Sequence, residues 1–324
     1  MSEDAGPDRS RARRALSFAL RAAVSVLLVV VLVWKIPLAE VGGALQHVPL
    51  TGVLLGVLVT AAQVVTGTLR WKRMLALAGE DQPLSALLSD VLIASAYNLV
   101  LPSSVGGDVI RALRCAKRLS NPHAAWSTTL FERMIGLPTL AVVAAPGIAL
   151  VPGGAPLVLP TLAFAIVTVL VLLFVDAPVA ALARFLTARA PAAAAVTEGI
   201  VRDLRGPLGT PAARLEAFAW SLAYQALGIS ILAACVVPLL DRQLLLAIYA
   251  GLPIIVVASM IPISIAGFGV RESLFVVVLG RLGVPEATAL ALSVLWLGSY
   301  VVLAGPGVLL VLRGDRTGDV NRAI

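Results

Sequence analysis

The stretch LPSSVGGDVIRA at 101–112 interrupts a long apolar run, and a related stretch, IPISIAGFGVRE at 261–272, interrupts another one 160 positions later. Aligned without gaps, the two stretches share a proline, a serine, a glycine and an arginine. The offset is close to half of the 324 residues, as expected for an internal duplication. Breaks at corresponding positions of two halves are the best sequence indication of a transporter-type substrate site.

The rest of the chain is too apolar for a water-soluble protein. Apolar residues make up 59% of it and charged residues 13%, and the mean hydropathy is +0.97. A soluble protein needs more charge to cover its surface. At about 20 residues per crossing, the length allows roughly seven or eight membrane passes. The net charge of +7 comes from residues that flank the apolar runs, so we expect contacts with lipid headgroups and no nucleic-acid partner.

The apolar and charged segments alternate along the chain. The apolar runs are 15–36, 49–69, 85–101, 124–150, 157–176, 215–238, 242–261 and 286–312. The stretches too charged for hydrocarbon are 1–14, 70–83 (with Arg70, Lys72 and Arg73) and 177–214. Cationic loops prefer the cytoplasm. We therefore interpret 177–214 as a cytoplasmic connector between two halves.

The charge rule constrains how many runs cross the membrane. If 70–83 and 177–214 are both cytoplasmic, an even number of crossings separates them, yet three apolar runs lie between them. We predict that the shortest of these runs forms a re-entrant hairpin near 85–118. The same reasoning predicts a hairpin near 242–281 that enters from the opposite side. The predicted fold is all-α, a polytopic transmembrane helical bundle with two re-entrant helical hairpins in an inverted-topology repeat.

This topology divides the chain into consecutive segments. They are a cytoplasmic basic tail 1–14, a first transmembrane repeat 15–176, the cytoplasmic connector 177–214, the rest of the second repeat 215–312 (which begins with span 157–176) and a cytoplasmic tail 313–324. Both termini are expected in the cytoplasm and the chain in the plasma membrane.

The two breaks carry residue types that suit an anion. Pro102 and Pro262 end the first arm of each hairpin because proline has no N–H to donate. The small residues that follow permit a tight turn, and the second arm then begins with free N–H groups and a partial positive charge. Arg111 and Arg271 come next, and a guanidinium can bind phosphate through two hydrogen bonds. The predicted substrate-binding residues are Ser104, Gly106, Gly107, Asp108, Arg111, Glu132, Arg133, Ser264, Gly267, Gly269, Arg271 and Glu272.

Other interpretations of these residues stay open at this point. The glycines could serve close helix packing, and the arginines could reach the interface along their alkyl stems. Glu132 and Arg133 are adjacent on a helix and point about 100° apart. Glu132 is therefore expected to pair with Arg111 or Arg114 of another helix, or to lie at the interface. Asn98 is expected to satisfy backbone groups at the turn.

Several kinds of chemistry lack their sequence signals. Cys115 and Cys235 lie in different halves without metal-ligand company, so we expect no disulfide, metal site or cofactor. Phosphatidyltransferases need several grouped aspartates for metal ions, and this chain offers only Asp90 and Asp108 near one span. The P-loop pattern of ATP-binding proteins does not occur. We expect that the chain is not an enzyme and is not driven by ATP directly.

The same motifs, in the same order, resemble a known family. The residues that carry the resemblance are Pro102, Ser104, Gly106, Gly107, Asp108, Arg111, Glu132, Arg133, Pro262, Ser264, Gly267, Gly269, Val270, Arg271 and Glu272. The family is the lysylphosphatidylglycerol synthase transmembrane region, the flippase-like domain of the bacterial multiple peptide resistance factor. The resemblance covers nearly the whole chain and implies an integral plasma-membrane protein that moves a lipid between leaflets.

The resemblance also implies a limit. The resistance factor continues into a cytosolic acyltransferase-like domain, whereas this chain stops 12 residues after its last apolar run. We expect a stand-alone member without synthase activity, whose lipid is an anionic glycolipid or a polyprenyl-phosphate-linked lipid. Two alternatives remain: an accessory subunit of a membrane glycosyltransferase or lipid-modifying system, and an integral-membrane lipid-modifying enzyme. The expected partners are a lipid with an anionic headgroup and such a membrane enzyme.

Overall fold

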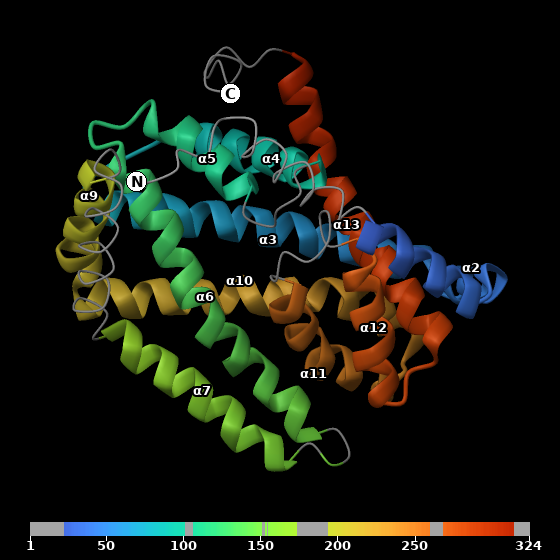
Figure 1. Ribbon diagram of the computed structural model, residues 1–324. Coiled ribbons are helices and arrows are strands. Elements are labelled where there is room, and N and C mark those ends of the chain that lie inside the picture. The colour runs from blue at the N-terminus through green and yellow to red at the C-terminus, as the bar shows by residue number, and fades with distance from the viewer. Residues whose placement is uncertain are drawn as a thin grey trace, which may run out of the picture.

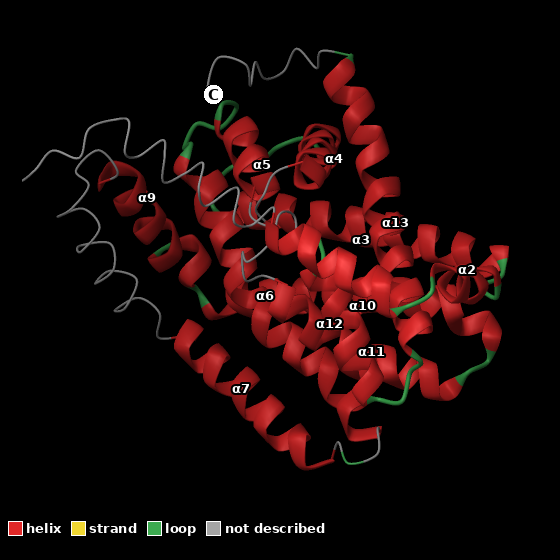
Figure 2. Cartoon of the chain, turned by 45° about the vertical axis from the view of Figure 1, so that its right-hand side comes forward, coloured by secondary structure: helices red, strands yellow, loops and turns green. Residues whose placement is uncertain are grey.

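The computed structural model describes residues 23–100, 106–150, 153, 155–173, 194–259 and 268–313, and every regular element in these ranges is a helix (Figures 1 and 2). After a first helix, Ala23–Lys35, the elements are α2 (Leu38–Gln46), α3 (Leu50–Leu77), α4 (Leu84–Val100), α5 (Gly106–Ala116), α6 (His123–Leu150), α7 (Ala155–Leu173), α9 (Ala194–Arg205), η2 (Pro207–Gly209), α10 (Pro211–Val236), η3 (Val237–Leu239), α11 (Arg242–Ser259), α12 (Val270–Arg281) and α13 (Glu286–Leu312). The prediction of an all-α fold is confirmed.

Within the described ranges, five helices are long and apolar enough to cross a membrane. They are α3, α6, α10 with its short 3-10 extension, α11 and α13. A sixth span results if Ala23–Lys35 and α2, which meet at an angle of 81°, count as one. Helices α4 and α7 are apolar but shorter. The described long helices are fewer than the seven or eight passes that the length allows, because the chain turns sharply after Lys35 and the apolar parts of α4 and α7 are shorter.

Helix α3 corrects the expected boundary at residue 70. The sequence placed Arg70 in a charged loop, yet α3 continues to Leu77. Trp71, Met74 and Leu75 are fully buried and recur at helical spacing, so one face of the last two turns packs inward. Arg70 is itself buried in the helix bundle. A high local density of charge therefore marked the end of the apolar run but not the end of the helix.

The chain enters α4 and leaves α5 at the same end of the bundle, and we call such an arrangement a returning pair. Glu80, which follows α3, accepts backbone hydrogen bonds from Ser120 (3.2 Å) and Asn121 (2.5 Å) beyond α5. The two helices contact each other along their length. The fully buried Asp90 of α4 joins them by ion pairs with Arg114 and Arg118. The pair thus opens at the end of the bundle where α3 finishes.

Helices α11 and α12 also form a returning pair, at the other end of the bundle. Gly283, which follows α12, lies beside Gln243 at the start of α11; a Cβ on this glycine would be 2.9 Å from the amide nitrogen of Gln243. Val284 and Leu244 pack in one core cluster with Val41 of α2. Helix α2 leads into the start of α3. The two helix pairs therefore open toward opposite ends of α3.

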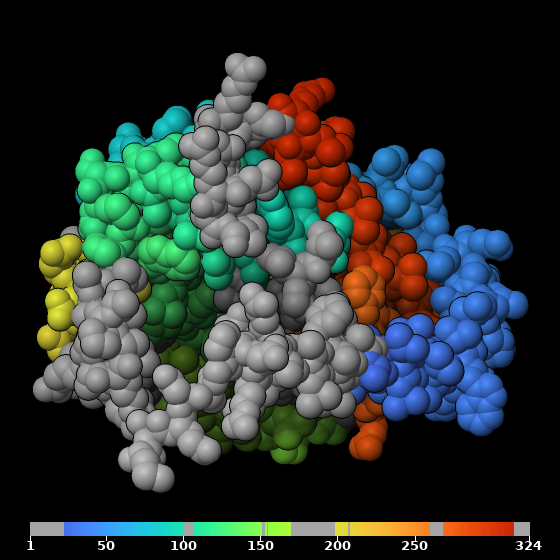
Figure 3. All heavy atoms as spheres, turned by 45° about the horizontal axis from the view of Figure 1, so that its top comes forward, coloured from blue at the N-terminus to red at the C-terminus, as the bar shows by residue number. Residues whose placement is uncertain are grey.

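Close backbone approach holds the long helices together. A Cβ on Gly52 of α3 would collide with the carbonyl of Cys235 on α10, and one on Gly307 of α13 would collide with the carbonyl of Leu92 on α4. In the space-filling view α13 lies directly beside α4 (Figure 3). Small residues permit such contacts in membranes, where the lipid gives no hydrophobic force for helix association. Large apolar side chains, such as Leu58 and Leu159, remain exposed and suit lipid contact.

The charged segments gather at one end of the bundle. Arg73 of α3 pairs with Glu216 of α10 at 2.5 Å, and Asp203 of α9 accepts a hydrogen bond from Ser127 of α6 at 2.7 Å. The end of α3 and the residues after 194 therefore lie side by side. Residues 177–193 of the connector fall outside the described residues.

Candidate functional site

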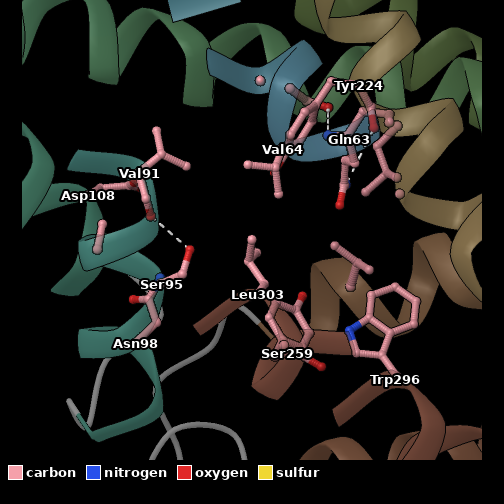
Figure 4. Close-up of a pocket in the computed structure, with 18 of the residues that line it drawn as sticks. Gln63, Val64, Val91, Ser95, Asn98, Asp108, Tyr224, Ser259, Trp296 and Leu303 are labelled. Carbon is pink, nitrogen blue, oxygen red and sulfur yellow. Dashed lines mark hydrogen bonds between the residues drawn. The ribbon is translucent and has the colours of Figure 1, made fainter. Parts of the chain in front are cut away.

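A cavity of about 420 Å³ lies inside the bundle, where the two helix pairs meet α3, α6, α10 and α13 (Figure 4). Arg111 of α5 and Arg271 of α12 both line it. The duplicated arginines, 160 positions apart in sequence, thus face one space. The stretches that precede them, 101–105 and 260–267, lie outside the described residues. The predicted site residues that fall there are Pro102, Ser104, Pro262, Ser264 and Gly267.

On one wall of the cavity, alternating charges from three helices form a chain of ion pairs. Glu132 of α6 accepts from Arg70 Nε at 2.8 Å through Oε1 and from Arg111 Nη2 at 2.9 Å through Oε2. Asp108 accepts from Arg111 Nε at 3.0 Å through Oδ1 and from Arg133 Nε at 2.6 Å through Oδ2. We call these five residues the ion chain. The expected pairing of Glu132 with Arg111 is present, and Arg114 pairs with Asp90 instead.

The ion chain is shielded from water at its Arg70–Glu132 end, where pairing is energetically most important, and is more exposed at Arg133. The side chain of Glu132 is only 3% exposed, and that of Arg70 is 9% exposed. The Tyr224 ring lies 4.5 Å from the Arg70 guanidinium and the Trp71 ring 4.7 Å from that of Arg111, within reach of cation–π attraction. Removing one partner of a buried ion pair costs about 3–5 kcal/mol, because an uncompensated charge is left behind. The carboxylates of the ion chain therefore stabilise the buried arginine charges by pairing with them.

The second-half arginine has simpler surroundings. Arg271 donates to Oε1 of its neighbour Glu272 at 2.5 and 3.1 Å, and its guanidinium lies 5.6 Å from the Phe268 ring. Oε2 of Glu272 accepts from the backbone N–H of Gly269 at 2.7 Å and so caps α12. Gly269 itself has φ +81°, a left-handed conformation that favours glycine. Asp108 bridges two arginines whereas Glu272 caps a helix, so the two acids differ in their contacts.

The predicted site residues divide into two groups by position. Those that line the cavity are Asp108, Arg111, Glu132, Arg133 and Arg271. Those that support the helix starts beside it are Gly106, Gly107, Gly269 and Glu272. A Cβ on Gly107 would lie 2.6 Å from the carbonyl oxygen of Ala94. The backbone N–H of Gly107 donates to Asn98 Oδ1 at 2.8 Å. Asn98 thus satisfies a backbone group at the turn, as expected, and also lines the cavity.

Sequence reasoning missed several cavity residues. Arg70 was assigned to a loop, and Gln63, Tyr224, Gln225 and Trp296 were passed over as parts of apolar runs. Gln63 and Gln225 are amides within predicted spans, and polar residues at membrane depth usually face the bundle interior. That signal was available in the sequence. Nothing in the local pattern shows that α3, α10 and α13 bring these side chains to the same cavity.

The lining has an excess of positive charge. Four arginines and two carboxylates line the cavity among the described residues, and with Glu272, which pairs with Arg271 beside it, the excess is one positive charge. Arginine keeps its proton in proteins, so this excess persists across the physiological pH range. In a cavity with low-dielectric walls, an uncompensated positive charge attracts anions. The site is therefore suited to an anionic group, and the guanidinium forks suit phosphate geometry in particular.

The fold and the cavity define a multi-pass helical membrane protein with a polar, arginine-rich interior. The family described as the lysylphosphatidylglycerol synthase TM region matches residues 18–307, and the chain belongs to this family. The match spans both helix pairs and every residue of the ion chain. The resemblance found from the motifs is thereby confirmed. No curated protein matches the chain.

Proposed function

We propose that the chain is a lipid flippase of the plasma membrane, which moves an anionic glycolipid or a polyprenyl-phosphate-linked lipid between leaflets and does not modify it chemically. The observation that carries the proposal is that Arg111 and Arg271, one from the break in each half, line a single cavity. Each arginine follows the start of a short helix that belongs to a returning pair. An anionic headgroup in this cavity is within reach of both halves.

The opposite openings of the two helix pairs support an alternating-access mechanism. The α4–α5 pair opens at the end of α3 and the α11–α12 pair at its beginning. We interpret them as the two re-entrant hairpins of an inverted repeat. In transporters built this way, one half moves against the other around a central site, which faces each side in turn. Cytoplasmic termini and a cytoplasmic end of α3, with its Arg73 and Lys72, agree with the positive-inside rule.

The ion chain supports binding that is reversible. Glu132 places its two oxygens on Arg70 and Arg111 much as two phosphate oxygens would lie. Arg70 donates to Glu132 and Ser221, and Arg111 donates to Asp108 and Glu132, so each guanidinium uses two of its five N–H groups. An incoming phosphate can accept from the remaining N–H groups, so that Glu132 and Asp108 keep their arginine partners and no buried carboxylate is left unpaired. A carrier needs this balance, because a substrate that binds too tightly is not released.

Lipid translocation by the purified chain tests the proposal. Proteoliposomes would carry a fluorescent anionic lipid, and a membrane-impermeant quencher would report its exchange between leaflets. We expect rapid exchange with wild type and a large loss with Arg111→Gln or Arg271→Gln at matched incorporation. Arg73→Gln is the matched control, because Arg73 pairs with Glu216 outside the cavity. Exchange no faster than in empty liposomes would favour an accessory-subunit role, and full activity in both cavity variants would contradict the headgroup site.

A further inference from the structure

We infer that the cavity wall opposite Asp108 and Asn98 binds a neutral, hydroxyl-rich extension of the phosphate headgroup, and that the cavity disfavours a cationic aminoacyl headgroup. The inference rests on the proposed function and narrows its substrate class. In Figure 4, Asp108 and Asn98 lie on one side of the cavity, and Gln63, Tyr224 and Trp296 lie on the other. We call this second group, together with Gln225, the amide–aromatic wall.

The aromatic part of this wall has hydrogen-bonding groups that the protein does not use. Trp296 is 8% exposed and its indole ring faces the cavity (Figure 4). Both Trp296 and Tyr224 line the cavity, and no hydrogen bond between described residues uses the Trp296 Nε1–H or the Tyr224 hydroxyl. A buried indole N–H normally finds a partner. A cyclic polyol could accept a hydrogen bond from the indole N–H through one hydroxyl and pack its ring against the indole face.

The amide part supplies matching acceptors. Gln225 donates through Nε2 to the carbonyl of Gly136 at 3.0 Å, and Gln63 donates weakly to the carbonyl of Tyr224 at 3.5 Å. Both interactions use the amide nitrogens, and among the described residues no donor reaches either amide oxygen. Hydroxyl groups both donate and accept, so a polyol ring can bind these oxygens and the indole N–H together. A cavity of about 420 Å³ lies within the usual range for small-ligand sites, roughly 300–1,000 Å³.

The charge distribution argues against a cationic extension. Every carboxylate oxygen of Asp108 and Glu132 already accepts from an arginine, and both oxygens of Glu272 are engaged by Arg271 and Gly269. A lysyl group would therefore meet four arginines, and each carboxylate of the described lining already shares its charge with two of them. Like charges in a site shielded from water repel strongly. The lysylated lipid in the family's name is thus a poor fit to this cavity.

The test compares lipids that share a phosphate and acyl chains but differ in the extension. Phosphatidylinositol, phosphatidylglycerol and lysylphosphatidylglycerol would be titrated onto the detergent-purified full chain and followed by native mass spectrometry. We expect phosphatidylinositol to bind about tenfold more tightly than phosphatidylglycerol, the effect of one or two added hydrogen bonds, and lysylphosphatidylglycerol to bind least. Soluble myo-inositol 1-phosphate should bind far more weakly, since it lacks the acyl chains.

Two variants assign the preference to the wall. Trp296→Leu and Gln63→Leu should bring the ratio of phosphatidylinositol to phosphatidylglycerol affinity close to one. Leucine is close to glutamine in size. Unlike Trp296→Leu, the Gln63→Leu substitution leaves the ring contact between Trp296 and Phe275 in place. Tyr249→Phe is the control, because it removes a hydroxyl bonded to Ser230 away from the cavity, and the wild-type ratio should persist.

Each comparison in this binding experiment tests a separate part of the inference. Equal wild-type affinity for phosphatidylinositol and phosphatidylglycerol, or an unchanged ratio in Gln63→Leu, would overturn the subsite but leave the flippase proposal standing. Tightest binding of the lysylated lipid would overturn the charge argument. Equal binding of inositol 1-phosphate would assign the site to a soluble sugar phosphate. Unchanged binding of all three lipids to Arg111→Gln would overturn the proposed headgroup site itself.

Discussion

Arg111 and Arg271 stand at equivalent positions of the two breaks, yet their surroundings differ. Arg111 contacts acids from two helices, Asp108 and Glu132, and lies over an aromatic ring. Arg271 pairs with Glu272, the next residue in sequence. At the position 160 residues after Glu132 stands Leu292, so the second half has no equivalent acid. The two similar stretches thus share the arginine but not its partners.

The difference indicates a division of roles between the halves. The Arg111 guanidinium is fixed by contacts to α5 and α6, and through Glu132 it is linked to α3. Arg271 is held mainly by its own helix and by the ring of Phe268. Side chains held by several elements lose less freedom when a ligand binds. We therefore expect a preorganised first-half arginine and a more adaptable second-half arginine.

The sidedness of the two pairs gives an all-or-none prediction. In a background with Cys115→Ala and Cys235→Ala, Ser85→Cys at the start of α4 and Gln243→Cys at the start of α11 should label from opposite sides of the membrane. Both positions are exposed and lie at opposite ends of the bundle. Labelling with a membrane-impermeant maleimide on intact and permeabilised cells measures this. Labelling of both from one side would remove the inverted arrangement.

Loss of each arginine should destabilise the fold to different extents. Arg111→Gln leaves two buried carboxylates short of a partner, and we expect the free energy of unfolding to fall by about 3–5 kcal/mol. For Arg271→Gln we expect about 1–2 kcal/mol, since Glu272 keeps its helix-capping hydrogen bond. Denaturant titration in detergent, followed by tryptophan fluorescence, measures both. The Arg111→Gln/Glu132→Gln double variant should recover part of the loss, and equal losses for the two single variants would refute the asymmetry.

The close packing of α5 on α4 at Gly107 predicts an intermediate effect. In Gly107→Ala the added Cβ would press on Asn98 and on the carbonyl of Ala94, and we expect destabilisation by about 2 kcal/mol, typical of overpacking. Gly280→Ala in α12 is the matched control, because its Cβ would meet nothing within 4 Å and alanine favours a helix. Thermal unfolding in detergent compares the two. If both variants melt at the wild-type temperature, the close approach at Gly107 does not hold the pair.

Lysine substitutions should give the smallest effect. Arg111 uses Nε for Asp108 and Nη2 for Glu132, a fork that one ammonium group cannot reproduce. We expect Arg111→Lys to lower the translocation rate about tenfold and Arg271→Lys about threefold, because the latter keeps its charge beside one flexible partner. The proteoliposome assay at matched incorporation measures both rates. A larger loss in Arg271→Lys than in Arg111→Lys would reverse the proposed division of roles.

Several features of the site follow from local sequence. The prolines and glycines of the two motifs predicted helix breaks near residues 102 and 262, and helices end before and begin after each break. The neighbouring positions of Glu132 and Arg133 predicted that Glu132 pairs with another helix, and it does. The re-entrant hairpins, the inverted repeat and the transport function stay predictions.

The sequence by itself determined the helical membrane class, the family and the positions of the breaks, because apolar runs, proline and glycine act on burial and backbone hydrogen bonds within a few residues. Only the tertiary structure decided which charges meet. Arg70 belongs to the site because its guanidinium, on α3, donates to Glu132 on α6, 62 positions away in the sequence. Gln63 and Trp296 share a wall for the same kind of reason. Such contacts depend on how long helices are rotated and shifted against one another, and no local pattern encodes that register.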